Sequence, residues 1–328
     1  MFSVMTWNVE NLFVPAANDP QNQRDRFDQK LALLAATINA LSPDVIALQE
    51  LGPRALGRLQ NTLGSGAYPA AHEGVPGDRG IRVGVLSRLA FQGPAANIVN
   101  FTGPPPIDQI QGLDNAGAVV SLNRLGRGAV RVTVNADGTT AHIITCHLKS
   151  KLLTFPGGVF STNDEGLRAR VGAIALMRRA AEAAQVRLVA SQLMAQHPDD
   201  GVIVLGDLND SPSAATSQLL LGPSGSEIGT LGFNIPDEGD RTRLFNTAPR
   251  ISEDRRYSRR HRGTGELLDQ IFASEELFPR DNGQRRLPTV DSHVDFADGL
   301  PSVTDNPNVR SAEIAPDHAP VTASFELA

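Results

Sequence analysis

The sequence has 328 residues, of which 41% are hydrophobic, with a net charge of -6 and a pI of about 5.7. A chain of this size buries about three-quarters of the surface that it exposes when unfolded, so the composition predicts a globular protein and excludes a disordered one. The acidic balance excludes a global basic field that would recruit nucleic acid, so an anionic substrate requires a local basic patch or a metal.

The sequence bounds the cellular compartment only loosely. Cys146 is the single cysteine, so no intrachain disulfide can form and nothing indicates an oxidising compartment. Near the N-terminus, Trp7, Asn8 and Glu10 stand where an export signal would need an apolar core. No apolar run approaches the roughly 20 residues that span a bilayer. We expect a cytoplasmic protein as the chain stands, or a secreted one if a signal peptide has been removed.

The first part of the chain alternates strand and helix. Phe2 to Trp7 alternates in polarity and predicts a strand that ends at Asn8. Between Arg24 and Leu41 apolar residues recur at helical spacing, and Pro43 follows where a helix should have stopped. Asp44 to Glu50 then predicts a buried strand that ends in a carboxylate. This alternation is typical of an α/β layer.

The middle of the chain predicts hairpins. Arg54 to Leu63 predicts a short helix, and three consecutive prolines predict a loop from Thr102 to Gly112. Asp137-Gly138 is a turn signal between two strand-like runs, which indicates an antiparallel pair and therefore a mixed sheet. The strands expected here lie at 81–87, 96–101, 117–122, 129–134 and 141–147.

A long helix and a hydrophobic strand follow. Asp164 to Ala195 has apolar side chains at helical spacing, and Thr162-Asn163-Asp164-Glu165 matches a capping box at its start. Gly201 to Asp207 is an aliphatic run enriched in β-branched residues, which predicts a buried strand. Gly206 within it would let the backbone approach a ligand.

The last part of the chain is less regular. After a short helix near 213–221, residues 222–265 are rich in glycine, proline and charge, and we expect a long irregular insertion there. Strands are expected at 267–273 and 319–327, with a loop-like stretch at 279–316 between them. Because no internal repeat or low-complexity linker is present, we expect a single domain over residues 1–328.

Polar side chains collect at or near the ends of the expected strands. Expected strands end at Asn8, Glu50, His147 and Asp207 with Asn209, whereas Asp269 lies within a strand and Asp317 and His318 just precede another. The oxygen ligands among them suit a hard divalent cation such as Mg²⁺ and do not suit zinc, which prefers cysteine and histidine. Histidines beside such a metal would transfer protons during hydrolysis of a phosphodiester.

Six motifs in the order of the chain carry a resemblance to a known family. They are Thr6-Trp7-Asn8-Val9-Glu10-Asn11, Ile46-Ala47-Leu48-Gln49-Glu50, His147-Leu148-Lys149-Ser150-Lys151, Gly206-Asp207-Leu208-Asn209, Leu268-Asp269-Gln270-Ile271 and Pro316-Asp317-His318-Ala319-Pro320-Val321. The ordered set resembles the endonuclease/exonuclease/phosphatase superfamily. The resemblance implies a four-layered α/β sandwich, in which two mixed β-sheets pack face to face with helices outside and a single site lies at one end.

The resemblance also implies roles for the metal and water positions. Glu50 resembles the principal metal carboxylate, and Asn8 and Asp317 would complete the metal and phosphate environment. Asp207 and Asn209 resemble the pair that positions or activates the attacking water and holds the phosphate. The implied cofactor is Mg²⁺ or Mn²⁺, with Ca²⁺ as a structural ion, and the number of catalytic metals stays open.

The two histidines of these motifs have different counterparts in the family. His318 would contact the scissile phosphate, with Asp269 orienting and charging it. His147 resembles the candidate general acid of the branch related to pancreatic-type deoxyribonucleases and bacterial extracellular nucleases, which suggests a bacterial origin. Abasic-site repair enzymes place another residue there, so their activity is not expected. Which histidine is the acid and which is the base stays open.

Several basic residues are candidates for holding the substrate. Arg82, Lys149 and Arg168 could bind phosphates, although Asp164 and Glu165 are also spaced to pair with Arg168. The run from Arg255 to Arg262 contains Tyr257 and could stack on a base, or it could be a solvated loop. The histidines without a motif are expected to be structural or superficial, and they are His72, His142, His197, His261 and His293.

These features predict a metal-dependent phosphodiesterase acting on DNA or RNA, as a monomer without a protein partner. The alternative is a phosphatase or phosphodiesterase for lipid, inositol or other small phosphate esters. A lipid substrate would require an apolar or aromatic loop facing the membrane, and the sequence has no aromatic cluster of that kind. A catalytically inactive binding module is disfavoured because every expected catalytic position is filled.

Overall fold

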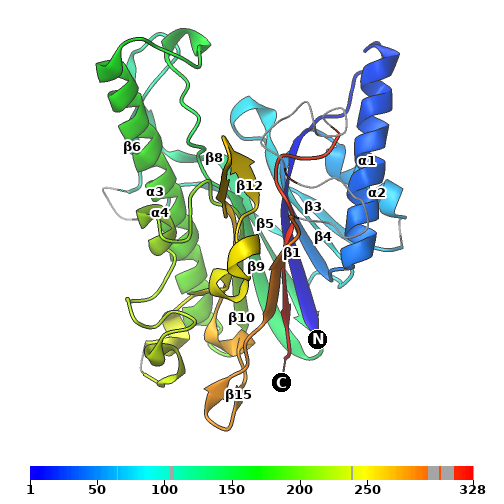
Figure 1. Ribbon diagram of the computed structural model, residues 1–328, viewed down its shortest axis with the longest axis vertical. Helices are drawn as coiled ribbons and strands as arrows, with labels where there is room; N and C mark the ends of the chain where they lie inside the picture. Colours follow the sequence, from blue (N-terminus) through cyan, green and yellow to red (C-terminus); the bar gives the residue numbers. More distant parts are fainter. Residues whose placement is uncertain (65, 104–106, 238, 295–302, 304–313, 328) are drawn as a thin grey trace.

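Two mixed β-sheets packed face to face form the centre of the structure, and helices cover their outer faces (Figure 1). The computed structural model describes all residues except 65, 104–106, 238, 295–302, 304–313 and 328. In the described part of the chain each of the two sheets has six strands. None of the described helices combines the length and the hydrophobicity needed to span a bilayer.

The first sheet has the strand order β17-β18-β1-β2-β4-β3. Its strands are β1 (Phe2–Leu12), β2 (Val45–Leu51), β3 (Ala70–Glu73), β4 (Arg82–Ser87), β17 (Thr289–Ser292) and β18 (Val321–Phe325). Helix α1 (Gln21–Leu41) crosses over between β1 and β2, which are the parallel pair of this sheet. Helix α2 (Ala55–Leu63) follows β2 and packs on α1.

The second sheet has the strand order β11-β14-β10-β9-β8-β5. Its strands are β5 (Ala96–Asn100), β8 (Arg124–Ala136), β9 (Thr139–His147), β10 (Gly201–Asp207), β11 (Phe245–Asn246) and β14 (Asp269–Ala273). Helix α3 (Glu165–Gln196) connects the parallel strands β9 and β10. The hairpin between β8 and β9 turns at Asp137-Gly138, as expected.

The alternation of side chains along the strands divides the core into three layers. Val4 and Val45 of the first sheet face Ile143 and Ile203 of the second sheet in the cluster between the sheets. Residues of the opposite face, such as Met5, pack under α1 and α2 in a second cluster. The outer face of the second sheet packs under α3 in a third cluster. Sheets and helices therefore form the four layers that the resemblance implied.

Some elements differ from the sequence expectation. Asp164, and not Thr162, caps α3, because its carboxylate accepts from the amide of Leu167 at 2.9 Å. The stretch 222–265 is not wholly irregular, since it contributes β11 to the second sheet, and the stretch 279–316 contributes β17 to the first. Strand β3 and the start of β6 at Ile110 were not expected either. For these strands, pairing with a neighbouring strand prevails over weak local propensity.

Short elements complete the described chain. The remaining strands and α-helix are β6 (Ile110–Leu113), β7 (Val119–Leu122), α4 (Ala215–Gln218), β12 (Arg259–His261), β13 (Thr264–Glu266), β15 (Arg280–Asp281) and β16 (Gln284–Arg285). The 3-10 helices are Asp78–Gly80, Pro156–Gly158, Leu231–Asn234, Asp240–Thr242, Ala248–Arg250, Glu253–Arg255 and Glu275–Leu277.

Gly206 is required by a close approach of two strands. A Cβ at this position would lie 1.9 Å from the carbonyl oxygen of Cys146 on β9, and the φ angle of Gly206 is 152°. The sequence analysis had suggested that the backbone of Gly206 approaches a ligand. In the structure it approaches the neighbouring strand instead. This approach draws the ends of β9 and β10 together, next to His147 and Asp207.

Candidate active site

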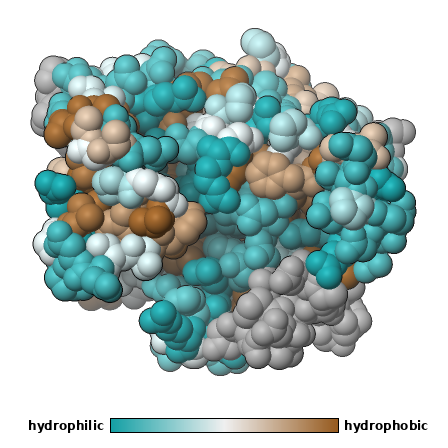
Figure 2. Space-filling model, turned by 90° about the horizontal axis from the view of Figure 1, so that it is seen from above, coloured by the Kyte–Doolittle hydropathy of each residue, from teal (hydrophilic) through white to brown (hydrophobic). Residues whose placement is uncertain are grey.

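The polar ends of β1, β2, β9 and β10 meet between the two sheets. The amide of Asn8 on β1 donates to Asp207 on β10 at 2.9 Å and to Glu50 on β2 at 3.3 Å. In Figure 2, which looks onto this end of the molecule, a mainly hydrophilic hollow lies at the centre, with apolar surface on the side where α3 and β6 lie. Residues from both sheets therefore form one site.

Left-handed backbone conformations aim side chains into this site. By alternation, Glu50 would share the outer face of β2 with Leu48, which packs in the cluster under α1. Its φ of 63° interrupts the register of β2 and brings the carboxylate to Asn8 and to the amide of Asn11, which donates at 2.9 Å. Asn209 also has a positive φ, of 53°. Such conformations are costly for residues other than glycine and collect at functional sites.

His318 and Asp269 form a buried pair on the other side of the site. Nδ1 of His318 lies 2.6 Å from Oδ2 of Asp269, and the two side chains are 5% and 0% exposed. The hydroxyl of Ser258 donates to the same carboxylate oxygen at 2.6 Å and accepts from the amide of Asp269 at 3.1 Å. The orientation of His318 is therefore set by Asp269, which Ser258 in turn holds in place.

Three further contacts hold the segment that carries His318. The indole of Trp7 donates to the carbonyl of His318 at 2.8 Å. Arg259 forms an ion pair with Asp317, in which Nε lies 3.0 Å from Oδ2. The carboxylate of Glu10 accepts from the amide of Asp317 at 3.0 Å. These contacts tie β1, β12 and the residues before β18 to one another.

His147 and Asn209 complete the surroundings of Asp207. Nε2 of His147 lies 3.3 Å from Oδ2 of Asp207, and both side chains are about 1% exposed. The amide nitrogen of Asn209 donates to the other carboxylate oxygen of Asp207 at 2.8 Å, and its side chain donates to the carbonyl of Leu148 at 3.0 Å. Asp207 thus lies between His147, Asn8 and the backbone of Asn209.

The two histidines differ in charge. Burial would lower the pKa of His318, but the carboxylates of Asp269 and Asp207 outweigh burial and raise that pKa to about 10. Burial, together with the charges of Arg127 and His318, holds the pKa of His147 well below its ordinary value. At neutral pH His318 is therefore an imidazolium and His147 is neutral.

Burial also raises the pKa of Asp207, to about 6, although the charge of His318 opposes this effect. The nearby carboxylate of Asp269 raises it further. An additional positive charge nearby would stabilise the ionised form of a buried carboxylate such as Asp207. This is one reason to test whether the site fits a divalent cation.

The residues of the site fit such a cation. Atoms of Asp207, Asp269 and His318 all lie within 4.8 Å of one another, and of these the two carboxylates would bind the ion, since His318 is an imidazolium. Oδ1 of Asp269 is buried and accepts no hydrogen bond from the described residues. With Glu50 and Asn8 adjacent, most donors are oxygen atoms, which is the preference of Mg²⁺ and Mn²⁺. Asp317 differs from the other predicted ligands because Arg259 is its ion-pair partner.

A basic cavity adjoins His147. Its volume is about 640 Å³, and Arg79, Arg127 and Lys149 line it. Burial and the charge of Arg127 lower the pKa of Lys149 to about 8. Arg178, Asp78 and Asp114 also line the cavity. The apolar part of the lining includes Leu152, Leu153, Phe155, Phe160, Val171 and Ile174. An acidic protein therefore has a local cationic surface beside its candidate active site.

The other predicted basic residues are placed differently. Arg82 on β4 is ion-paired with Glu73 at 3.2 Å. Arg168 lies in the first turn of α3 and pairs with Glu165 at 2.6 Å, where both side chains are exposed. The run from Arg255 to Arg262 makes internal contacts, including the ion pair of Arg255 with Asp291 and the stacking of Arg260 on Tyr257. Of the three predicted substrate cations, the basic cavity includes Lys149 alone.

Sequence reasoning missed several residues of the site. Ser258 orients Asp269 although the two residues are eleven positions apart in the sequence. Trp7 belongs to the same motif as Asn8, and its indole holds the carbonyl of His318. Arg79 and Arg127 reach the cavity from the 3-10 helix Asp78–Gly80 and from β8. Ser258 could have been found by its place in the arginine-rich run before the Asp269 motif, whereas the two arginines carry no local signal.

Comparisons with known proteins agree with this geometry. The sequence model of the endonuclease/exonuclease/phosphatase family matches residues 5–305. A search by sequence against curated proteins finds no match.

Solved structures share the fold at low sequence identity. A truncated TDP2 from Caenorhabditis elegans is 15% identical, with 99% of this chain and 96% of that chain covered and a TM-score of 0.56. A mannosyl-6-phosphatase, Bt3783 of Bacteroides thetaiotaomicron VPI-5482, is 14% identical, with full coverage of both chains and a TM-score of 0.58. A structure from Beutenbergia cavernae DSM 12333, described as an endonuclease/exonuclease/phosphatase, is 19% identical, with 99% and 71% covered and a TM-score of 0.52.

The match of the family model over most of the chain, together with the four-layered fold and the convergence of the six motifs at one site, identifies the chain as a member of the endonuclease/exonuclease/phosphatase family, whose members are hydrolases that act on phosphate esters.

Proposed function

We propose that the protein is a divalent-metal-dependent phosphodiesterase that hydrolyses nucleic acid as a single-domain monomer. The observation that carries this proposal is the convergence of Glu50, Asn8 and Asp207 with the buried His318–Asp269 pair. An oxygen-rich acidic cluster beside an imidazolium offers charge stabilisation on two sides of a phosphate. A bound divalent cation would neutralise the phosphate and lower the pKa of an attacking water.

The charges of the two histidines suggest how their roles divide. His318, as an imidazolium, can donate a hydrogen bond from Nε2 to a phosphate oxygen while Asp269 holds Nδ1. His147 is neutral, so it is better suited to accept a proton than to supply one. This differs from the general-acid role that the resemblance suggested for His147. Asp207, held by Asn8 and Asn209, can orient or deprotonate the water.

The basic cavity supports an extended anionic substrate. Arg79, Arg127 and Lys149 lie on the side of His147, beyond the residues that would hold the scissile phosphate. A second phosphate of a nucleic-acid backbone would meet positive charge there. A substrate with one phosphate would leave these cations unused.

A second candidate function follows from the apolar wall of the same cavity. Phe155 and Phe160 lie there with several leucines, which the aromatic content of the sequence had not suggested. A small phosphodiester or phosphomonoester with an apolar group, such as a lipid, would fit such a wall. The mannosyl-6-phosphatase of the same fold supports small phosphate esters in general.

Cleavage assays with pure protein test the proposal. Supercoiled plasmid, single-stranded DNA and RNA would be incubated with Mg²⁺ or Mn²⁺, with a chelator as the negative control. We expect metal-dependent cutting, and in Asp207→Ala a loss of about 10³-fold or more with the fold retained. Equal cutting by a folded Asp207→Ala variant would contradict the assignment of the site. Absence of cutting, with hydrolysis of phospholipid vesicles or sugar phosphates instead, would favour the second candidate.

A further inference from the structure

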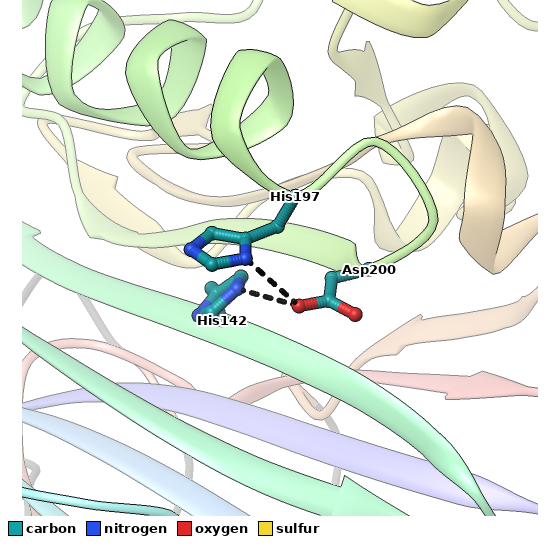
Figure 3. A group of neighbouring side chains, drawn as sticks. All are labelled: His142, His197 and Asp200. Atoms are coloured by element: carbon teal, nitrogen blue, oxygen red, sulfur yellow. Dashed lines mark hydrogen bonds and ion pairs between the residues drawn. The ribbon is translucent and has the colours of Figure 1, made fainter.

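A second cluster of metal-ligating side chains, drawn in Figure 3, lies next to the start of β10, at the end of the strand opposite to Asp207. His142 is on β9, His197 caps the C-terminus of α3, and Asp200 precedes β10. His142 and His147 are five residues apart on one strand, so they are separated by about 17 Å. His142 shares the outer face of the sheet with Ile144, whereas His147 points between the sheets.

The three side chains present their ligand atoms to a common point. Oδ2 of Asp200 lies 3.1 Å from Nε2 of His142 and 3.8 Å from Nδ1 of His197. All three atoms are within 4.8 Å of one another. Ligand atoms around a tetrahedral zinc ion, with bonds of about 2.0 Å, lie about 3.3 Å apart. A small movement of the exposed His197 would bring the cluster to that geometry.

A neighbouring hydroxyl fixes the buried ligand. Oγ1 of Thr133, on the adjacent strand β8, lies 2.9 Å from Nδ1 of His142. Metal-bound histidines characteristically make such a contact with their second nitrogen, which sets the orientation of the ring and its tautomer.

We propose that His142, His197 and Asp200 form a binding site for a first-row divalent transition metal, with Zn²⁺ as the best-matched ion. Two imidazoles and one carboxylate favour zinc over Mg²⁺, which prefers oxygen ligands alone. Asp200 and His142 are 26% and 7% exposed and His197 is 49% exposed, so water can complete the coordination. The ion would fasten the end of α3 and the start of β10 to β9.

Zinc titration of the metal-free full-length chain tests this site. Isothermal titration and thermal melting would compare the wild type with His197→Ala and Asp200→Asn, and His72→Ala would serve as the matched control. All variants would carry Asp207→Asn, because the candidate active site could also bind zinc. We expect saturable zinc binding that raises the melting temperature, an affinity at least tenfold weaker in both ligand variants, and no change in His72→Ala.

A second comparison separates coordination from a merely structural role. Thr133→Val should weaken zinc binding by about tenfold, and Thr133→Ser should restore it. In the background with Asp207 intact, His197→Ala should leave phosphodiester cleavage in Mg²⁺ unchanged. Zinc binding that is the same in the wild type, His197→Ala and Asp200→Asn, or no saturable binding in the wild type, would overturn the proposal.

Discussion

The two ends of the β9–β10 pair place a buried histidine beside a carboxylate, but in different surroundings. At the carboxyl end, Nε2 of His147 lies 3.3 Å from Asp207, and Asn8 and Glu50 of the other sheet are close by. At the amino end, Nε2 of His142 lies 3.1 Å from Asp200. The further neighbour there is a second histidine, His197, and not a group of the other sheet.

The difference shows that the strand pair alone does not determine the chemistry. The carboxyl end faces another sheet, which contributes oxygen donors, so it suits a hard cation and a phosphate. The amino end lies under the end of a helix and is open to water, so it suits a borderline metal such as zinc. Substitutions at or near one end should therefore have effects that matched substitutions elsewhere do not have.

Stability should depend far more on one end of β10 than on the other. A Cβ at Gly206 would lie 1.9 Å from a backbone oxygen, which cannot move without breaking the sheet, so Gly206→Ala should cost more than about 4 kcal/mol of unfolding free energy. At Gly201 the nearest atom is 2.7 Å away and belongs to the side chain of Leu277, so Gly201→Ala should cost about 1 to 2 kcal/mol. Urea denaturation measures both, and equal losses would refute the close approach.

Of the histidines at the two ends, only those at the carboxyl end, His147 and His318, should be needed for activity. His318→Gln removes the positive charge that we propose faces the substrate phosphate, so kcat/KM should fall by about 10³-fold. His142→Gln should leave kcat/KM within about twofold if the variant folds, since His142 lies on the other face and at the other end of the sheet. Steady-state kinetics, with circular dichroism to verify folding, decide this. A large loss in a folded His142→Gln would mean that the two ends are coupled.

The charge of His318 should depend on Asp269. Because the pKa of His318 in the folded protein is about 10, above its ordinary value of 6.5, its ionised form stabilises the fold fully below about pH 6.5. This stabilisation is lost as the pH rises through about 10. In metal-free Asp269→Asn the main source of the raised pKa is gone, so His318 should titrate at lower pH. NMR titration of the ring, with His142 as an internal reference, would test this, and an unchanged midpoint would contradict it.

The smallest effects are expected from two exposed arginines. Arg79 lines the basic cavity, so Arg79→Ala should raise KM about three- to tenfold with little change in kcat. Arg168 is in an exposed ion pair with Glu165, whose contribution is small, so Arg168→Ala should change KM by less than about twofold. If Arg168→Ala had the larger effect on KM, the substrate would not lie over the cavity.

The sequence predicted the strand ends better than the paths of the loops. Asn8, Glu50, His147 and Asp207 end hydrophobic runs. Parallel pairing brings Asn8 to Glu50 in one sheet and His147 to Asp207 in the other, and the face-to-face sheets that the resemblance implied bring the two pairs together. The left-handed conformation of Glu50 could not be expected, because it depends on how β2 pairs with β1 and β4.

Residues joined only by tertiary folding escaped the sequence analysis. Ser258 and Asp269 come together through the β12–β13 ribbon. His142, His197 and Asp200 come from a strand, a helix end and a loop, without a spacing that indicates a metal site. The long stretches 222–265 and 279–316 gave little periodicity. Within them β11 and β17 pair with the edges of the two large sheets, whereas β12–β13 and β15–β16 form separate two-stranded ribbons.

Anomalous diffraction from crystals soaked separately with Mn²⁺ and Zn²⁺ would test both ends in one measurement. We predict a manganese peak between the sheets, within bonding distance of Glu50 and Asp207, and a zinc peak among His142, His197 and Asp200. No manganese peak between the sheets, in crystals of protein that cleaves phosphodiesters with Mn²⁺, would contradict the central claim that the converging strand ends form a divalent-metal site.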